Sequence, residues 1–153
     1  MKLSLLGAVL VTVCACGCAR PESRLVPNVS VASALTHAAR EGAGHTVRLA
    51  ELTDFPWDTF VAFGPYTERT RAESVLGFAW PDYDRFELAS SDSFSLLVFT
   101  KGQAIVRVEQ LARSPVEFAP VALARPFTPG QAFFTLLASE GRLLLVPTKG
   151  RVA

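Results

Sequence analysis

The candidate functional residues of this chain are concentrated in and after residues 54–67, DFPWDTFVAFGPYT, which contain five aromatic side chains and two aspartates. Aromatic rings whose polar tips face a groove can stack on a sugar or on an aromatic ligand. The candidate ligand-binding residues of such a platform are Trp57, Asp58, Tyr66, Trp80 and Tyr83. Aromatic rings also bury large areas in a hydrophobic core, and this simpler interpretation is favoured for most of them.

The aspartates suggest a second kind of chemistry, because the hydrolysis of a glycosidic bond uses two carboxyl groups that lie roughly 5 to 10 Å apart. The candidates are Asp54 and Asp58, each paired with Asp82, Asp84 or Asp92. Aspartates near strand ends and turns more often accept hydrogen bonds from the backbone. The structural role is therefore favoured, and the sequence predicts no catalytic residue.

Other enzyme classes lack their sequence signals in this chain. There is no G-x-S-x-G, H-E-x-x-H, P-loop or G-x-G-x-x-G motif. A serine–histidine dyad would have to combine the serines of residues 90–93 with His37 or His45, and nothing in their spacing supports it. Two histidines are too few for the common zinc sites. We therefore predict a protein that is not an enzyme and that uses no cofactor and no metal.

Composition and charge narrow the class of partner. Half of the 153 residues are apolar, so the chain has enough apolar side chains for one well-packed domain. The 15 basic and 14 acidic residues nearly cancel, and the basic residues are scattered along the chain. Nucleic-acid binding needs a basic patch that displaces counterions from phosphates, so no nucleic-acid partner is predicted.

The first residues have the order of an export signal. Lys2 precedes an apolar run over residues 3–13, and small residues and cysteines follow it. About 11 helical residues at 1.5 Å each reach only ~16 Å, which is roughly half of the hydrocarbon core of a bilayer. The run therefore predicts a signal peptide that is removed, and not a transmembrane helix.

All three cysteines, Cys14, Cys16 and Cys18, lie at the end of this run. Cys16 and Cys18 each follow a small residue, and this part of the chain resembles a bacterial lipoprotein signal. The resemblance implies cleavage before Cys16 or Cys18 and acyl chains such as palmitate on that cysteine, which would bind the protein to the membrane through its N-terminal lipid. Because Gly17 or Ala19 follows the cysteine, and not aspartate, it implies the outer membrane, facing the periplasm, if the host is Gram-negative.

Two other interpretations of the same segment are weighed against lipidation. Ordinary secretion would use cleavage after Ala15 or Ala19 and would leave no lipid. A C-x-C-x-C metal site is less favoured, because the cysteines lie beside the apolar run and no companion cluster of histidine and cysteine is present in the sequence.

The chain is predicted to comprise a lipoprotein signal peptide with its lipidation site over residues 1–18, a tether over 19–28 and a single α+β domain over 29–153. Apolar spacing and punctuating residues predict the elements of this domain. Helices are expected between Ser30 and Gly42 and over 68–76, and strands over 45–52, 57–63, 83–88, 94–100, 104–111, 132–138 and 142–147. We expect a mainly antiparallel sheet of five to six strands with two short helices on one face.

Two details of this fold can be stated further. Both faces of residues 57–63 are apolar, which predicts a strand that is covered on both faces and lies in the centre of the sheet. Hairpin turns are predicted at Lys101-Gly102 and at Glu140-Gly141, because glycine adopts the positive φ angles that tight hairpins require.

The pattern W-D-x5-G-P-Y-T over residues 57–67, followed by G-x-x-W over 77–80, resembles a group of small bacterial exported proteins that includes lipoproteins. The S-L-L-V-F segment at 95–99 and the F-T-P segment at 127–129 extend the resemblance over most of the domain. The resemblance implies no activity and no catalytic residue for this chain.

The sequence therefore predicts a lipid-anchored protein of the cell envelope, whose domain binds a partner or supports structure without catalysis. The expected partner, apart from the membrane, is another envelope protein or a glycan. A hydrolase that acts on cell-wall glycan through paired aspartates is the first alternative. A periplasmic inhibitor or immunity-type interaction protein is the second.

Overall fold

The structure, a computed structural model, describes residues 30–148. The predicted signal peptide over residues 1–18, with Cys16 and Cys18, and the predicted tether over 19–28 lie outside the described residues. Within residues 30–148, no helix is both long enough and apolar enough to span a membrane.

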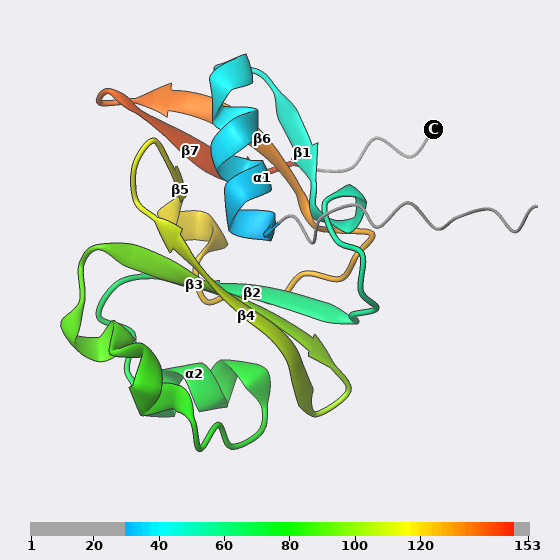
Figure 1. Ribbon diagram of the computed structural model, residues 1–153, viewed down its shortest axis with the longest axis vertical. Helices are drawn as coiled ribbons and strands as arrows, with labels where there is room; N and C mark the ends of the chain where they lie inside the picture. The colour runs from blue at the N-terminus through cyan, green and yellow to red at the C-terminus, as the bar shows by residue number, and fades with distance from the viewer. Residues whose placement is uncertain (1–29, 149–153) are drawn as a thin grey trace, which may run out of the picture.

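The described chain has an α+β fold, as predicted (Figure 1). Its α-helices are α1 (Val31–Ala38) and α2 (Arg69–Leu76). Its strands are β1 (Thr46–Arg48), β2 (Thr59–Phe63), β3 (Phe94–Lys101), β4 (Ala104–Ala112), β5 (Val116–Phe118), β6 (Phe133–Ser139) and β7 (Arg142–Pro147). Short 3-10 helices lie between several of these elements.

The seven strands of the described chain form two sheets, where the sequence predicted one sheet of five to six strands. One sheet has the order β1-β6-β7-β5 and the other has the order β2-β3-β4. The paired strands run antiparallel except β5 and β7, which are parallel. The mainly antiparallel arrangement is confirmed. The β6–β7 hairpin turns at Glu140 and Gly141, whose φ angles of 47° and 79° are those of a two-residue hairpin loop.

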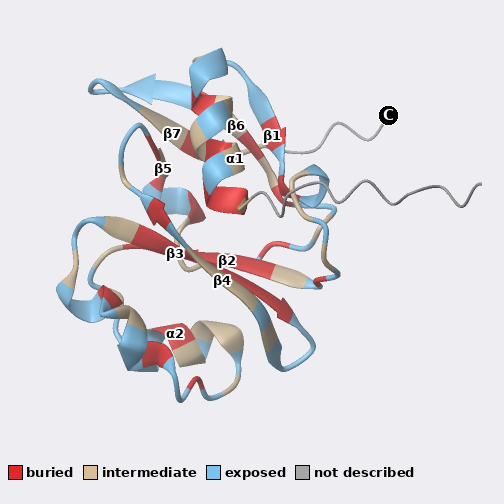
Figure 2. Cartoon of the chain, viewed as in Figure 1, coloured by how far each residue is buried: buried red, intermediate tan, exposed pale blue. Residues whose placement is uncertain are grey.

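The three-stranded sheet carries a hydrophobic core on each of its faces (Figure 2). Side chains alternate along a strand, so Phe60 and Phe99 point to one face while Val61 and Val98 point to the other. The first face forms the main core together with side chains of α1 and of the four-stranded sheet. The second face forms the α2 core, which includes Ala72 of helix α2.

The two helices therefore lie on opposite faces of the three-stranded sheet, and the prediction that both lie on one face is wrong. Leu35 of α1 is fully buried in the main core, and Ala72 of α2 is fully buried in the α2 core. The apolar pattern of a strand shows that both faces are covered, but it does not identify the element that covers each face.

Strand β2 is covered on both faces as predicted, since its residues 60–63 are fully buried. It is not the central strand, because it lies at one end of the order β2-β3-β4. Its outer edge is closed by a later segment of the chain. The backbones of Phe60 and Phe127 exchange two hydrogen bonds of 2.8 Å, and the N–H of Ala124 donates to the carbonyl of Ala62 at 2.7 Å. This segment protects an edge that would otherwise be open.

The predicted strand over residues 83–88 is wrong. Two 3-10 helices, Tyr83–Phe86 and Leu88–Ser90, occupy this stretch. Glu87 lies between them in the left-handed region, with a φ of 54°, which a strand does not contain. These 3-10 helices direct Tyr83 and Phe86 toward the three-stranded sheet. The candidate site lies between this segment and the sheet.

Candidate functional site

Trp57 belongs to the main core. Only 7% of the residue is exposed, and its ring packs against that of Phe99 with the centroids 5.4 Å apart. Its indole N–H donates a hydrogen bond to Thr53 Oγ1 at 2.9 Å. Because the apolar body and the polar tip of Trp57 both have partners within the protein, the structure gives this residue a packing role.

Asp58 closes the end of the β3–β4 hairpin. Its Oδ2 atom accepts a hydrogen bond from the backbone N–H of Gly102 at 2.9 Å, and its own N–H donates to the carbonyl of Thr100 at 2.8 Å. Gly102 has a positive φ of 57°, as the predicted turn requires. The carboxylate of Asp58 therefore supports a turn, which is the structural role that the sequence favoured.

Tyr66 lies on the surface and is 61% exposed. Its backbone is in the left-handed region with a φ of 58°, which is unfavourable for a residue that has a Cβ atom. Its N–H donates to the carbonyls of Leu88 at 3.0 Å and Ser91 at 3.3 Å, and these bonds hold the conformation. The ring of Tyr66 is thus displayed to solvent by the local backbone.

Trp80 and Tyr83 contact each other in the α2 core, with their ring centroids 5.2 Å apart. Tyr83 is buried, and its hydroxyl donates a hydrogen bond to the carbonyl of Thr67. Burial raises the pKa of the Tyr83 hydroxyl, and the nearby carboxylates of Asp84 and Glu68 raise this pKa further. Tyr83 therefore stays protonated and acts as a donor inside the protein.

The structure does not bring the five predicted residues into one platform. Trp57 lies in the main core and Trp80 in the α2 core, on opposite faces of the three-stranded sheet. Tyr83 is fully enclosed and Asp58 is bound to a turn. Trp80 differs from these residues because it also lines an open groove.

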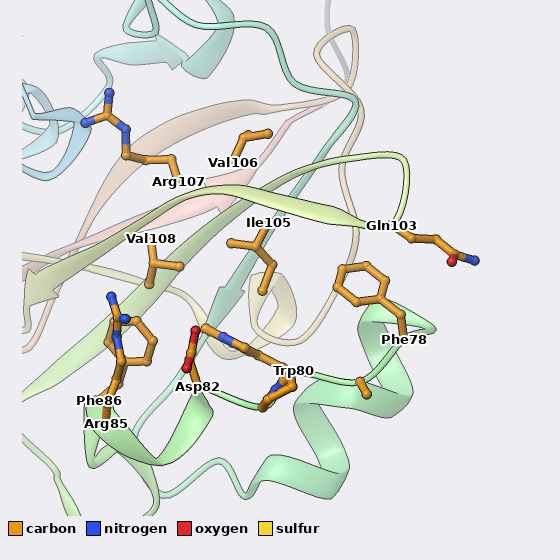
Figure 3. A pocket seen from close by; sticks show the side chains of 12 residues that line it. Phe78, Trp80, Asp82, Arg85, Phe86, Gln103, Ile105, Val106, Arg107 and Val108 are labelled. Atoms are coloured by element: carbon orange, nitrogen blue, oxygen red, sulfur yellow. The ribbon is translucent and has the colours of Figure 1, made fainter.

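This groove runs between strand β4 and residues 78–86 and has a volume of about 400 Å³ (Figure 3). We call it the β4 groove. Residues 78–86 line it with Phe78, Trp80, Asp82, Arg85 and Phe86, and the opposite side includes Gln103, Ile105 and Val108. Its volume is within the range of about 300 to 1,000 Å³ that is usual for small-molecule sites. Its lining mixes aromatic and aliphatic side chains with polar groups, and more of its exposed area is polar than apolar.

A β-bulge in β4 shapes the strand side of the groove. Ile105 and Arg107 pair with consecutive residues of β3, so Val106 between them has no partner in that strand. The extra residue allows Ile105 and Val108 to face the α2 core together. Arg107 points away from the groove, and its guanidinium lies 4.7 Å from the centroid of the Phe55 ring (Figure 3).

The indole N–H of Trp80 is the distinctive polar group of the groove. Trp80 is only 5% exposed, and its backbone N–H donates to Glu73 Oε1 at 2.7 Å. No group of residues 30–148 accepts a hydrogen bond from its indole nitrogen, whereas every fully enclosed side-chain nitrogen or oxygen in that range has a partner. The indole N–H must therefore reach solvent, and the groove is the opening that Trp80 lines.

Three further polar side chains line the groove. The carboxylate of Asp82 only accepts hydrogen bonds, the guanidinium of Arg85 only donates them, and the amide of Gln103 does both. The guanidinium of Arg85 lies 4.9 Å from the centroid of the Phe86 ring. No pattern in the sequence indicated Arg85 or Gln103 as site residues, and Gln103 reaches the groove only through the fold, from the β3–β4 turn.

Two of the other candidate carboxylates are engaged within the protein. Asp84 forms an ion pair with Arg69 of α2, and Asp58 binds the backbone of the β3–β4 turn. Within the described residues, no three side chains of histidine, cysteine, aspartate or glutamate are placed to hold a metal ion. Asp82 is thus the one candidate carboxylate of the predicted pairs that lines the β4 groove.

A second groove of about 550 Å³ lies beside α1, and its lining includes His37, Glu41, His45 and Leu52. Its walls are mainly apolar. Its polar side chains at His37, Glu41 and His45 are exposed, so this groove has no donor on a nearly enclosed residue such as Trp80. The β4 groove is therefore the stronger candidate site.

Comparisons with known proteins add no further information on the site. No protein family, no curated protein and no solved structure matches this chain.

Proposed function

We propose that this chain is a lipid-anchored protein of the cell envelope, whose α+β domain binds a ligand in the β4 groove without catalysing a reaction on it. The anchor is supported by the sequence, in which an apolar run ends at Cys16 and Cys18 with a small residue before each. Acylation of one of these cysteines would hold the domain at the membrane surface.

The observation that carries the binding proposal is the indole N–H of Trp80. Trp80 is 95% enclosed, yet its indole N–H has no acceptor among residues 30–148 and remains accessible to solvent. This donor opens onto a groove that also offers an acceptor at Asp82. A ligand that accepts from Trp80 and donates to Asp82 would satisfy both groups.

Binding is favoured over hydrolysis of a glycan by the arrangement of the carboxylates. A glycosidase needs two carboxyl groups on either side of the bond that it cleaves. Among the aspartates of the predicted pairs, Asp82 lines the groove, while Asp58 supports a turn and Asp84 pairs with Arg69. One carboxylate beside aromatic rings fits recognition better than acid–base catalysis.

The anchor is tested by metabolic labelling with radioactive palmitate. We expect the unmutated protein to carry the label and to remain with the membranes. The label should be lost in either Cys16→Ala or Cys18→Ala, and mass spectrometry of the mature N-terminus should identify the same cysteine. An unlabelled protein that is recovered in the soluble fraction would contradict the anchor.

The groove is tested with the fluorescence of Trp80. The chain has two tryptophans, so Trp57→Phe leaves Trp80 as the sole indole. We would add fractions of an envelope extract to this full-length variant in a sugar-free detergent, and we expect at least one fraction to change the emission saturably. Adding Asp82→Ala should weaken the response, and adding Asp54→Ala, at another exposed aspartate, should not. If no fraction changes the emission, the binding proposal fails.

A further inference from the structure

We propose that the ligand of the β4 groove is a neutral saccharide, an inference that rests on the proposed function because it takes this groove as the binding site. The groove is lined by both hydrogen-bond donors and hydrogen-bond acceptors. Trp80 offers a donor, Asp82 offers acceptors, and Gln103 offers both. A hydroxyl group can donate and accept at the same time, so a ligand with several hydroxyls can satisfy all three side chains.

The placement of the aromatic rings also favours a saccharide. Trp80 lies between Phe78, which is on the side of Gln103, and Phe86, which is on the side of Arg85 (Figure 3). The rings of Phe78 and Phe86 are both half-buried, so part of each remains accessible. Sugar rings have apolar C–H faces as well as hydroxyl edges, and an aromatic wall with polar neighbours matches both surfaces.

The charges of the groove favour a neutral ligand. The groove contains one carboxylate at Asp82 and one guanidinium at Arg85, and their formal charges cancel. Arg107 also lines the groove, but its guanidinium is directed away from the groove, toward the ring of Phe55. A strongly anionic ligand that pairs with Arg85 would be repelled by the nearby carboxylate of Asp82, and a cationic ligand that pairs with Asp82 would be repelled by Arg85. A neutral ligand would meet neither repulsion.

The β-bulge in β4 favours a saccharide over a peptide. A peptide would bind beside β4 by extending its ladder of backbone hydrogen bonds. The bulge at Val106 interrupts the regular spacing of β4 next to the groove, and bulges of this kind protect edge strands from pairing. Side-chain recognition of hydroxyl groups needs no regular strand edge, so the saccharide is favoured.

The experiment uses the full-length acylated Trp57→Phe variant in a detergent that contains no sugar, with Trp80 as the reporter. The probes are trisaccharides of glucose, of mannose and of N-acetylglucosamine, together with the active extract fraction before and after digestion by a protease or by a mixture of glycosidases. We expect at least one trisaccharide to change the emission saturably. The active fraction should survive the protease and lose its effect after the glycosidases.

Three variants locate the binding. Calorimetry should show that Asp82→Ala weakens the affinity for the trisaccharide at least tenfold and that Trp80→Phe, which keeps a ring but removes the N–H, weakens it at least fivefold. Asp54→Ala should leave it unchanged. An affinity that none of the groove variants alters would overturn the proposal, and circular dichroism of each variant would show whether the fold is retained.

The outcomes separate this inference from the function on which it rests. An active fraction that protease destroys and glycosidases spare would identify a peptide ligand, which overturns the saccharide and keeps the binding function. A fraction can be active although none of the three trisaccharides changes the emission. If glycosidases also leave that fraction active, the saccharide proposal is overturned. If no fraction is active, both proposals fall together.

Discussion

Ser30 and Glu109, which lie 79 residues apart in the sequence, form a hydrogen bond of 2.7 Å between the serine hydroxyl and the carboxylate. The same carboxylate oxygen accepts the backbone N–H of Ala32 at 2.9 Å, and Ser30 Oγ accepts the N–H of Ser33 at 3.3 Å. Strand β4 thus supplies a negative charge to the N-terminus of α1, where unpaired N–H groups favour it. This contact joins α1 to the three-stranded sheet.

Replacing Glu109 should therefore destabilise the protein. The Glu109 side chain is 10% exposed, and Glu109→Ala would leave the N–H of Ala32 and the hydroxyl of Ser30 without their acceptor. We expect a loss of about 1–3 kcal/mol in the free energy of unfolding, measured with urea. Glu109→Gln, which keeps an acceptor oxygen, should lose less. No loss for Glu109→Ala would show that the cap contributes little, whereas equal losses for both variants would show that the charge, and not the acceptor oxygen, carries its effect.

The ion pairs of Glu117 should make stability depend on pH. Arg113 Nε and Arg142 Nη1 donate to this carboxylate at 2.7 and 3.1 Å. Burial alone would raise the pKa of Glu117, but these hydrogen bonds and charges outweigh burial and lower the pKa. The folded state therefore binds this proton less tightly than the unfolded chain. The resulting stabilisation is complete above the usual pKa of 4.5 and is lost as the pH falls through the lower folded value.

Glu117→Gln tests this dependence. We expect it to lower the free energy of unfolding by about 1 kcal/mol at pH 7, and we expect the difference from the unmutated protein to shrink as the pH falls below 4.5. Urea unfolding at several pH values measures the difference, with Glu87→Gln at an exposed position as the control. A difference that stays the same at every pH would contradict the assigned ion pairs.

The two tryptophan N–H groups should exchange with solvent at different rates. The Trp57 indole N–H is bonded to Thr53 Oγ1, while the Trp80 indole N–H has no acceptor among residues 30–148 and opens onto the β4 groove. We expect the indole proton of Trp80 to exchange at least tenfold faster in nitrogen-15 NMR spectra. The Trp57→Phe variant assigns the two signals. Equal rates would remove the main observation behind the binding proposal.

The backbone of Tyr66 makes a prediction about strain. Its φ of 58° is costly for any residue with a Cβ atom and is free of that cost for glycine. The ring is mostly exposed, so its removal should cost little. We expect Tyr66→Gly to be more stable than Tyr66→Ala by roughly 1 kcal/mol in thermal unfolding. If Tyr66→Ala is the more stable of the two variants, residue 66 does not adopt the left-handed conformation.

Much of the local structure could be predicted from the sequence, because it depends on residues that lie close together in the chain. Ser30 caps α1, Gly77 ends α2 with a φ of 79°, and Glu140-Gly141 forms the predicted hairpin. Each of these features follows from the side chain or from the φ preference of one or two residues.

The division into two sheets and the composition of the site could not be predicted in this way. The apolar residues of β2 indicate burial on both faces, but the choice of α1 or α2 for a face depends on contacts across the whole chain. Glu87 adopts a left-handed φ that no local pattern announces. Gln103 lines the same groove as Trp80 only because the β3–β4 hairpin lies beside residues 78–86. The sequence indicated Trp80 as part of a stacking platform, but the fold determines which side chains line the groove beside it.

The pairing of β1 with β6 bears on the order in which the protein can form. Thr46 and Thr135, whose hydroxyls lie 3.1 Å apart, are separated by 89 residues, so the four-stranded sheet has to wait for the last third of the chain. A chain that has emerged only as far as Ala112 contains the three-stranded sheet, but it lacks Phe134, which packs on Phe60 in the finished fold. A partly synthesised chain therefore leaves this aromatic face of the three-stranded sheet uncovered until the last strands are present.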